Sequence, residues 1–453
     1  MSTASKKYSG VFHSVFFGGL QKLSVPLSGV LITMILTKGA LTIDEMGVWA
    51  IFMTITSIQE TVRQGLVKTS LIKYLNYCQP EEQKYVLTIA FILNAFITTI
   101  TALLLFFFAS RIANVERAPQ LKQMLYIFQV GMFIMIFFSH FEWVMYAKMK
   151  FKGLFWVYFF RQGSSLLFVA SLFFLTHKVS LNTLVTIYNA SLLAGTLVGF
   201  YYVRPMLTYS FAFSREWLWK MLHFGKYVFG SNLSTLVFRS ADQMMVSPIS
   251  KSTSYTASLN ISARVITLTD LPSQTLGDVL FPKSAKKENS DNPSMAKYYY
   301  EKTVGASLFF ILPLVVLILL FPKLIIIILA TKQYYNAIPY LQMISVTAIF
   351  LAFLKQYGVI IDSTGRPQVN FITITIIGII QVIACYFFIK YFGLMGAGYA
   401  LLCTHVIGFI MTQSILKKYF NVNFLNCFKH AFMFYPEMFK HFKSILNEKW
   451  QAR

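Results

Sequence analysis

Charged side chains occur inside segments that are otherwise apolar, and these residues have the clearest capacity for chemistry. The cations among them are Lys22, Arg161, Arg239, Arg264 and Lys355. A charge at the centre of a membrane span costs about 2.5–3.5 kcal/mol on insertion scales, so it normally faces a protein interior or a water-filled cavity. Cations gathered in such a cavity would bind an anion. Phosphate is the best match, because a guanidinium offers two parallel donors to its oxygen atoms.

Acidic residues stand near some of these cations and not near others. Arg239 precedes Asp242 by three residues, a spacing that allows an ion pair within one helix. Glu60 and Arg63 have the same spacing. Each pair either holds one helix together or belongs to a site. No acidic residue stands at helical spacing from the remaining cations, and this favours an anion-binding cavity; they are Lys22, Arg161, Arg264 and Lys355.

These patterns predict two sets of site residues. The set predicted to bind the ligand combines the cations with nearby amides, and comprises Lys22, Arg161, Arg239, Arg264, Lys355, Gln21, Asn232 and Asn260. The set that would bind a coupling ion consists of carboxylates, and comprises Glu60, Glu142, Asp242 and Asp270.

The segments that must position these residues are membrane-spanning helices. Hydrophobic residues make up 56% of the 453 residues, and only 13% are charged, about half the share in soluble domains. Apolar segments of the ~20 residues needed to cross a bilayer recur along the whole chain. The sequence therefore predicts an all-α polytopic membrane protein with about twelve transmembrane helices, over 10–36, 46–67, 85–110, 122–146, 154–176, 181–203, 221–247, 254–281, 299–321, 337–361, 368–390 and 394–416.

The predicted helices fall into two six-helix halves with a similar plan. The first and seventh spans are both rich in Gly and Ser, and each leads through a polar turn into an amphipathic helix. Two halves of like topology are the parallel-repeat plan of several transporter folds. Polar faces on the first, second, seventh and eighth spans predict a central hydrophilic cleft. The expected domains are two six-helix halves, a basic cytoplasmic connection and a basic amphipathic cytoplasmic tail, at 1–203, 221–416, 204–220 and 417–453 respectively.

The net charge of +23 arises from 40 Lys and Arg residues, and it is best explained by topology. No basic domain exists that would bind nucleic acid. Basic residues instead concentrate in the N-terminal segment, in alternate loops and in the C-terminal tail, which places both termini in the cytoplasm by the positive-inside rule. The first apolar stretch exceeds the length of a signal-peptide core and is expected to be a permanent helix. In the tail, Phe420, Phe424, Phe428 and Phe432 repeat every four residues, which predicts interfacial helices on the anionic leaflet or, alternatively, a disordered basic segment.

Motifs for catalysis and for metal binding are absent from the sequence. There is no GxxxxGK[ST], HExxH or GxSxG, and no predicted loop exceeds about twenty residues, so no extramembrane catalytic domain is expected. The four cysteines are isolated and form no CxxC or Cys/His cluster. We expect no enzyme activity, no cofactor and no metal, which leaves transport.

Several stretches resemble the bacterial oligosaccharide flippases of the multidrug/oligosaccharidyl-lipid/polysaccharide exporter superfamily. The start of the second half is similar to that family's FG…GS/N…D run, its Y…R helix and its LFP before a basic loop, through Phe224–Asn232, Arg239–Val246, Tyr255, Asn260, Arg264, Leu271–Ser273 and Val279–Lys283. Near the N-terminus, Asp44–Gly47 resembles the family's P-E-x-G turn, with Asp44 where proline is common.

The resemblance implies a flippase that moves undecaprenyl-pyrophosphate-linked oligosaccharide repeat units across the bacterial inner membrane by alternating access. The products would be O-antigen, the polysaccharide of lipopolysaccharide, or capsule. Partners would be the lipid-linked oligosaccharide, membrane lipids and other polysaccharide assembly proteins. Two alternatives differ in their requirements. An ion-coupled multidrug exporter of the same superfamily would place carboxylates in the cleft, and a membrane glycan polymerase or ligase would carry a large external loop, which is absent here.

Overall fold

Helices account for nearly all of the chain that the computed structural model describes, namely residues 20, 24–207, 213–284 and 293–434. No residue within these ranges is in a strand. The chain packs as two compact units: unit 1 extends to Ile261 and includes Ile328–Gln333, and unit 2 comprises Ser262–Ile327 and Tyr334 onward. The prediction of an all-α polytopic membrane protein is confirmed.

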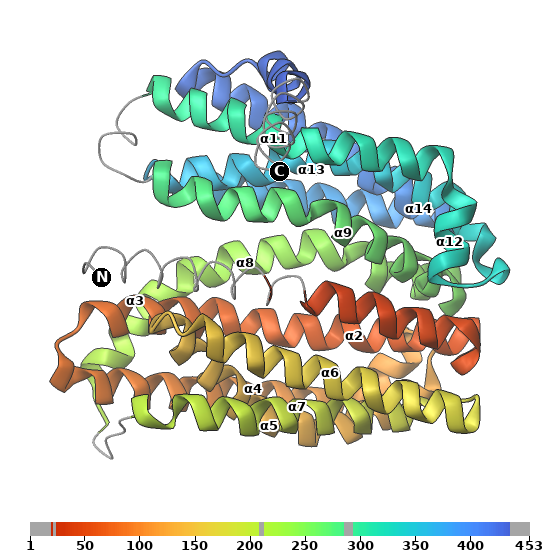
Figure 1. Ribbon diagram of the computed structural model, residues 1–453, viewed down its shortest axis with the longest axis horizontal. Helices are drawn as coiled ribbons and strands as arrows, with labels where there is room; N and C mark the ends of the chain where they lie inside the picture. Colours follow the sequence, from red (N-terminus) through yellow and green to blue (C-terminus); the bar gives the residue numbers. More distant parts are fainter. Residues whose placement is uncertain (1–19, 21–23, 208–212, 285–292, 435–453) are drawn as a thin grey trace, which may run out of the picture. The chain divides into compact units, whose positions relative to one another are not determined.

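Unit 1 contains long helices that run alongside one another (Figure 1). Helices α4 to α7 pack in sequence and against each other, and α8 packs along α2, η2 and α3. The elements are η1 (Leu36–Ala40), α2 (Ile43–Arg63), η2 (Gln64–Lys68), α3 (Thr69–Tyr77), η3 (Pro80–Glu82), α4 (Gln83–Val115), α5 (Pro119–Ala147), α6 (Phe151–Thr176), α7 (Leu181–Val203), η4 (Arg204–Met206), α8 (Arg215–Ser250) and the first part of α9 (Thr253–Ser284).

Local sequence signals fix where these helices begin. Thr42 starts α2 with a reciprocal capping box, in which Thr42 Oγ1 accepts from the Glu45 amide and the Thr42 amide donates to the Glu45 carboxylate. Pro119 occupies the first turn of α5, where its missing N–H costs nothing. Ser180 caps α7 by accepting from the Thr183 amide. Each of these starts lies within a few residues of a predicted span boundary.

Unit 2 contains the remainder of α9, α11 (Pro293–Leu320), most of α12 (Pro322–Leu329), the larger part of η5 (Lys332–Ala337), α13 (Ile338–Ser363) and α14 (Pro367–Phe420). Its core is formed by side chains of α11 and α13 such as Tyr300, Leu308 and Phe353. Helix α14 has 54 residues, roughly 80 Å if it were straight, but it breaks at Gly393, whose φ of 55° and ψ of −130° are not helical. The break separates the spans predicted at 368–390 and 394–416.

Seven helices of the described ranges are long and apolar enough to cross a membrane. Because α14 holds two predicted spans, these seven contain eight of the twelve expected. The first predicted span lies partly outside the described residues. The second, seventh and eighth correspond to α2, α8 and α9, which are less apolar than these seven helices because they carry the polar faces noted in the sequence.

The start of the C-terminal tail packs against protein. Residues 424–434 are helical, and Cys427 and Ala431 are fully buried in the core of unit 2. Glu301 of α11 accepts hydrogen bonds from the Asn423 amide at 2.9 Å and from Asn426 Nδ2 at 3.0 Å. One face of the predicted amphipathic helix therefore contacts the core rather than lipid. Its other face exposes apolar residues, and 435–453 lies outside the described residues.

Candidate functional site

A buried arginine links three helices of unit 1. Arg63, at the end of α2, is 1% exposed. Its Nη1 donates to Ser139 Oγ at 2.8 Å and to the Met135 carbonyl at 3.3 Å, both on α5. Asn94 of α4 donates to the same serine at 3.3 Å and to the Ile136 carbonyl at 2.8 Å. The guanidinium is thus held by neutral acceptors, which fixes the packing of α2, α4 and α5.

A buried carboxylate lies nearby on α5. Glu142 is 2% exposed, and its Oε1 is 3.3 Å from Lys68 Nζ and accepts from the Tyr158 hydroxyl at 3.0 Å. The other oxygen, Oε2, has no hydrogen-bond partner among the described residues. This oxygen is a buried acceptor without a partner, which costs free energy.

Arg161 of α6 is held by aromatic side chains. Its Nη2 donates to the Tyr188 hydroxyl at 3.1 Å, and its guanidinium carbon lies 4.7 Å from the centroid of the Phe138 ring and 5.7 Å from that of Tyr188. Such cation–π contacts are worth up to about 2 kcal/mol when desolvated. Arg63, Glu142 and Arg161 together form what we call the unit 1 network, which extends over α2, η2, α4, α5, α6 and α7.

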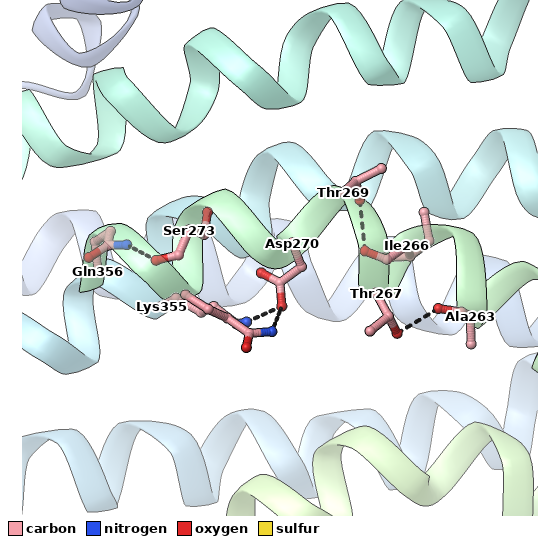
Figure 2. A network of polar contacts seen from close by, with 9 residues as sticks. Ala263, Ile266, Thr267, Thr269, Asp270, Ser273, Lys355 and Gln356 are labelled. Atoms are coloured by element: carbon pink, nitrogen blue, oxygen red, sulfur yellow. Dashed lines mark hydrogen bonds and ion pairs between the residues drawn. The ribbon is translucent and has the colours of Figure 1, made fainter. Parts of the chain in front are cut away.

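A second polar cluster joins α9 to α13 within unit 2 (Figure 2). Lys355 forms an ion pair with Asp270 Oδ2, and Gln274 donates to the same oxygen at 2.9 Å. The adjacent Gln356 donates to the Ser273 carbonyl at 2.9 Å. We call these five residues the unit 2 cluster. The sequence gives Lys355 no acidic residue at helical spacing, and the structure supplies one from another helix.

Arg264 stands on α9 in a different state from Lys355. It is half-buried, it forms no ion pair within the described ranges, and its Nε has no hydrogen-bond partner there. A guanidinium without a carboxylate keeps its capacity for two-pronged binding of an oxyanion.

The other predicted site residues are dispersed. Arg239 of α8 is exposed, whereas Asp242 is buried and accepts from the Gln243 amide at 2.9 Å. Glu60 and Arg63 form no ion pair in the described part of the chain, because Glu60 accepts instead from Gln64 at 3.0 Å. Three amides and one lysine complete the set: Asn232 lies against Gly65, Asn260 is buried with an unpartnered Oδ1, and Gln21 and Lys22 lie outside the described residues.

Sequence spacing did not reveal the partners that hold these groups. Ser139, Tyr158 and Tyr188 each come from a different helix than the charge they contact. Lys68 lies one residue beyond the second predicted span. One signal in the sequence is that Ser139 and Tyr158 each stand three positions from a charge on their own helix, Glu142 and Arg161. That spacing does not point to the charges that they contact, Arg63 and Glu142.

A family model described as "Polysaccharide biosynthesis protein" matches residues 40–339, well over half of the chain. The chain belongs to this polysaccharide biosynthesis protein family. The match covers the unit 1 network and the α9 residues of the unit 2 cluster, but not Lys355 and Gln356 of α13. The resemblance to oligosaccharide flippases of the exporter superfamily is confirmed at the level of the family.

Two solved structures share the fold. One is a multidrug resistance MATE family transporter of the MOP superfamily in an inward-facing conformation, with a TM-score of 0.75 and 15% identity over 88% of this chain and 99% of that chain. The other is the lipid II flippase MurJ in an inward closed conformation, with a TM-score of 0.76 and 14% identity over 92% of this chain and 90% of that chain. These two structural neighbours are a transporter and a flippase.

One sequence relative is an uncharacterized membrane protein, MJ1068, of Methanocaldococcus jannaschii. It is 24% identical over 214 residues, which are 47% of this chain and 42% of the relative. The chain therefore matches less than half of that relative's length. The match agrees with a multi-pass membrane protein.

Proposed function

We propose that this protein is a flippase that translocates undecaprenyl-pyrophosphate-linked oligosaccharide repeat units across the bacterial inner membrane by alternating access. Membership of the polysaccharide biosynthesis protein family supports a glycan cargo, and the fold shared with the lipid II flippase MurJ supports a lipid-linked one. Both termini lie in the cytoplasm under this proposal, and the product is O-antigen or capsule-type polysaccharide.

The observation that carries the proposal is the state of Arg264. A half-buried guanidinium on a polar helix, without a carboxylate partner in the described ranges, has a high affinity for an oxyanion. Pyrophosphate presents several oxygens at the spacing of a guanidinium fork. Arg264 therefore holds the pyrophosphate of the cargo, while the lipid tail stays in the bilayer.

Lys355 contributes to binding through an exchange of partners. Its side chain is 19% exposed, and its ammonium is paired with Asp270. When an anionic cargo arrives, the ammonium transfers from Asp270 to a cargo oxygen, and Gln274 continues to donate to the released carboxylate. When the cargo leaves, the ion pair re-forms. The exchange lets one cation bind and release a highly charged group without remaining unpaired in a membrane interior.

The test is the accumulation of lipid-linked repeat units in a deletion strain. We expect undecaprenyl-pyrophosphate-linked oligosaccharide to accumulate on the cytoplasmic side of the inner membrane and to clear when the wild-type gene is restored. Arg264→Ala should fail to clear it at normal protein abundance, whereas Lys122→Gln, an exposed change on α5, should clear it. A deletion strain with normal glycan export and no accumulation would contradict the proposal.

An ion-coupled multidrug exporter of the same superfamily is the second candidate, and Glu142 favours it. A buried carboxylate with one unpartnered oxygen is suited to carry a coupling proton or sodium ion, and the fold is shared with a MATE family transporter. Under this alternative, the deletion strain would become sensitive to cationic dyes without accumulating lipid-linked glycan. Glu142→Gln would reproduce that sensitivity while leaving polysaccharide export intact.

A further inference from the structure

Three turns of unit 1 that are far apart in the sequence enclose one polar pocket. They are the start of α2 with Thr42 and Asp44, the α4–α5 turn with Arg117 and the α8–α9 turn with Lys251. The pocket has a volume of about 460 Å³, which is within the ordinary range for small-molecule sites. The sequence predicts all three turns on the side of the membrane opposite to the termini, and the structure brings them together.

The pocket walls are held together by close packing and by hydrogen bonds between the three turns. A Cβ added to Gly47 would lie 2.0 Å from the Thr253 carbonyl oxygen, so α2 and α9 meet at a point where only glycine fits. Thr253 Oγ1 also donates to Asp44 Oδ1 at 3.2 Å. On the other side, Ser247 Oγ donates to the Glu116 carbonyl at 2.6 Å. The turns are thus fixed relative to one another by groups that do not use the cations.

The carboxylates of the pocket accept hydrogen bonds from protein groups, whereas its cations have no such partners in the described part of the chain. Both carboxylates have partners: Glu45 accepts from the Thr42 amide and hydroxyl at 2.9 Å each, and Asp44 accepts from Thr253. Neither Arg117 nor Lys251 forms an ion pair or a hydrogen bond through its side chain within the described chain. The lining thus carries two carboxylates and two cations, and the two cations are the charged groups whose side chains have no partner among the described residues.

Arg117 and Lys251 lie where α4 and α8 end, and both have the left-handed backbone that is common at the C-terminal ends of helices, with φ of 54° and 60°. Glu116, next to Arg117, is 3% exposed, and burial raises its pKa to about 8, so it is largely protonated at neutral pH and does not neutralise the arginine. The remaining walls consist mainly of hydroxyl and amide groups, including Gln120 and Ser252.

We propose that this pocket is a second binding site that takes an acidic saccharide, with Arg117 and Lys251 holding its carboxylate or phosphate group and the hydroxyl and amide groups binding its sugar hydroxyls. The assignment deepens the proposed function and rests on it in one respect: a glycan cargo supplies such a sugar on the side of the membrane where repeat units are delivered. The chemistry shared by all candidate occupants is an oxyanion, and the experiment separates the sugar from free phosphate and from a lipid headgroup.

The test uses the full chain in nanodiscs of zwitterionic lipid, with glucuronate as the probe and saturation-transfer NMR as the readout. We expect glucuronate to bind and glucose to bind at least 10-fold more weakly. Arg117→Asn combined with Lys251→Asn should weaken glucuronate at least 10-fold. Asparagine removes the charge and suits a left-handed backbone, so the variant should keep its unfolding temperature. Lys122→Gln, which removes an exposed cation outside the pocket, is the matched control and should bind as wild type.

Several results would overturn the proposal. Glucuronate binding within twofold of wild type in the double variant would place the site elsewhere. Equal binding of glucose would show that the site does not require an oxyanion. Tighter binding of inorganic phosphate than of glucuronate would show that the pocket binds simple anions rather than a saccharide. Loss of glucuronate binding in nanodiscs that contain anionic lipid would assign the pocket to a headgroup. If the double variant does not fold, the single variants Arg117→Asn and Lys251→Asn are expected to weaken binding at least threefold each, and unchanged binding in both would overturn the assignment.

The failure of this proposal is distinct from the failure of the proposed function. If glucuronate binding depends on Arg117 and Lys251 but deletion of the protein causes no glycan accumulation, the pocket is supported and the flippase function is contradicted. If lipid-linked glycan is cleared normally but glucuronate binding does not depend on these two residues, the flippase function is supported and the pocket is contradicted.

Discussion

The unit 1 network and the unit 2 cluster contain the same kinds of groups in different states. In unit 1, Arg63 is almost fully buried, and Glu142 is bonded to groups from two other elements. In unit 2, Lys355 and Asp270 pair with side-chain exposures of 19% and 8%, close to the 22% and 2% of Lys68 and Glu142, but Arg264 on the same unit has no ion-pair partner among the described residues. A network whose cations are bonded to protein groups stabilises one packing arrangement. A guanidinium without a carboxylate partner is suited to bind an anionic ligand.

The largest expected effect is on stability in unit 1. Lys68→Met removes the cation that faces Glu142, and breaking a buried pair from one side typically costs about 3–5 kcal/mol. We expect the free energy of unfolding to fall by about 3 kcal/mol, measured by chemical or thermal unfolding in detergent. The double variant Lys68→Met with Glu142→Gln should recover most of that loss, since no buried charge is left alone. A double variant as unstable as the single one would show that the pair is not what holds this region.

Arg264 should show the opposite balance, with a large effect on export and a small one on stability. A hydrogen bond to a charged group is worth about 1.5–3 kcal/mol, which corresponds to roughly a 10- to 100-fold loss of cargo affinity for Arg264→Ala. Arg264→Lys keeps the charge but loses the two-pronged geometry and should be intermediate. Clearance of lipid-linked glycan at matched protein abundance is the measurement. Full clearance by Arg264→Ala would contradict a ligand-binding role for Arg264 and with it the proposed difference between the two units.

Glu116 offers a comparison with Glu142, because it is a buried carboxyl of unit 1 without an ion-pair partner in the described ranges. Burial raises its pKa from 4.5 to about 8, so the folded state binds a proton that the unfolded state releases above pH 4.5. Stability from this group is therefore full below about pH 4.5 and is lost as the pH rises through 8, at up to about 1.4 kcal/mol per pH unit. Unfolding titrations of Glu116→Gln should show a flatter pH dependence than wild type, and an unchanged profile would contradict the assignment.

The smallest effect is expected for the ion pair of the unit 2 cluster. Asp270→Asn keeps an oxygen that can accept from Lys355, and the lysine left behind is 19% exposed, whereas Glu142 is 2% exposed. The loss of stability should therefore be about 1 kcal/mol. Export should fall more clearly than stability, because the lysine then has no protein carboxylate to return to after release of the cargo. A loss near 3 kcal/mol would place this pair in the same class as Lys68 and Glu142.

The sequence predicted the helical architecture well, because the length of each apolar segment can be read directly from neighbouring residues. Gly393 divides α14 where two spans were expected, and the polar helices α2, α8 and α9 are the ones whose sequences carry polar faces. The contacts of the site were less predictable. Helical spacing reveals partners on the same helix, as proposed for Glu60 and Arg63, and these two residues instead bond elsewhere.

Partners that come from other helices depend on how the helices pack, and one sequence contains no such information. Asp270 and Lys355 are 85 positions apart, and Arg63 and Ser139 are 76 apart. The assignment of Arg264 as a ligand-binding residue and of Glu142 as an ion-binding residue remains a prediction, as do the domain boundaries at 204–220 and 417–453. The pocket at Arg117 and Lys251 was not anticipated, because each of its turns is unremarkable alone.

The burial of the helix at 424–434 has a consequence for the order in which the protein is made. Glu301 bonds to Asn423, 122 positions later, and Cys427 and Ala431 complete the core of unit 2. At translation rates of 5–20 residues per second, the ribosome adds that interval in roughly ten seconds. During this time α11 stands in the membrane with an incomplete core and an unmet carboxylate. Unit 2 is therefore the last part of the chain to mature, and its assembly ends only when the region around residue 431 has emerged.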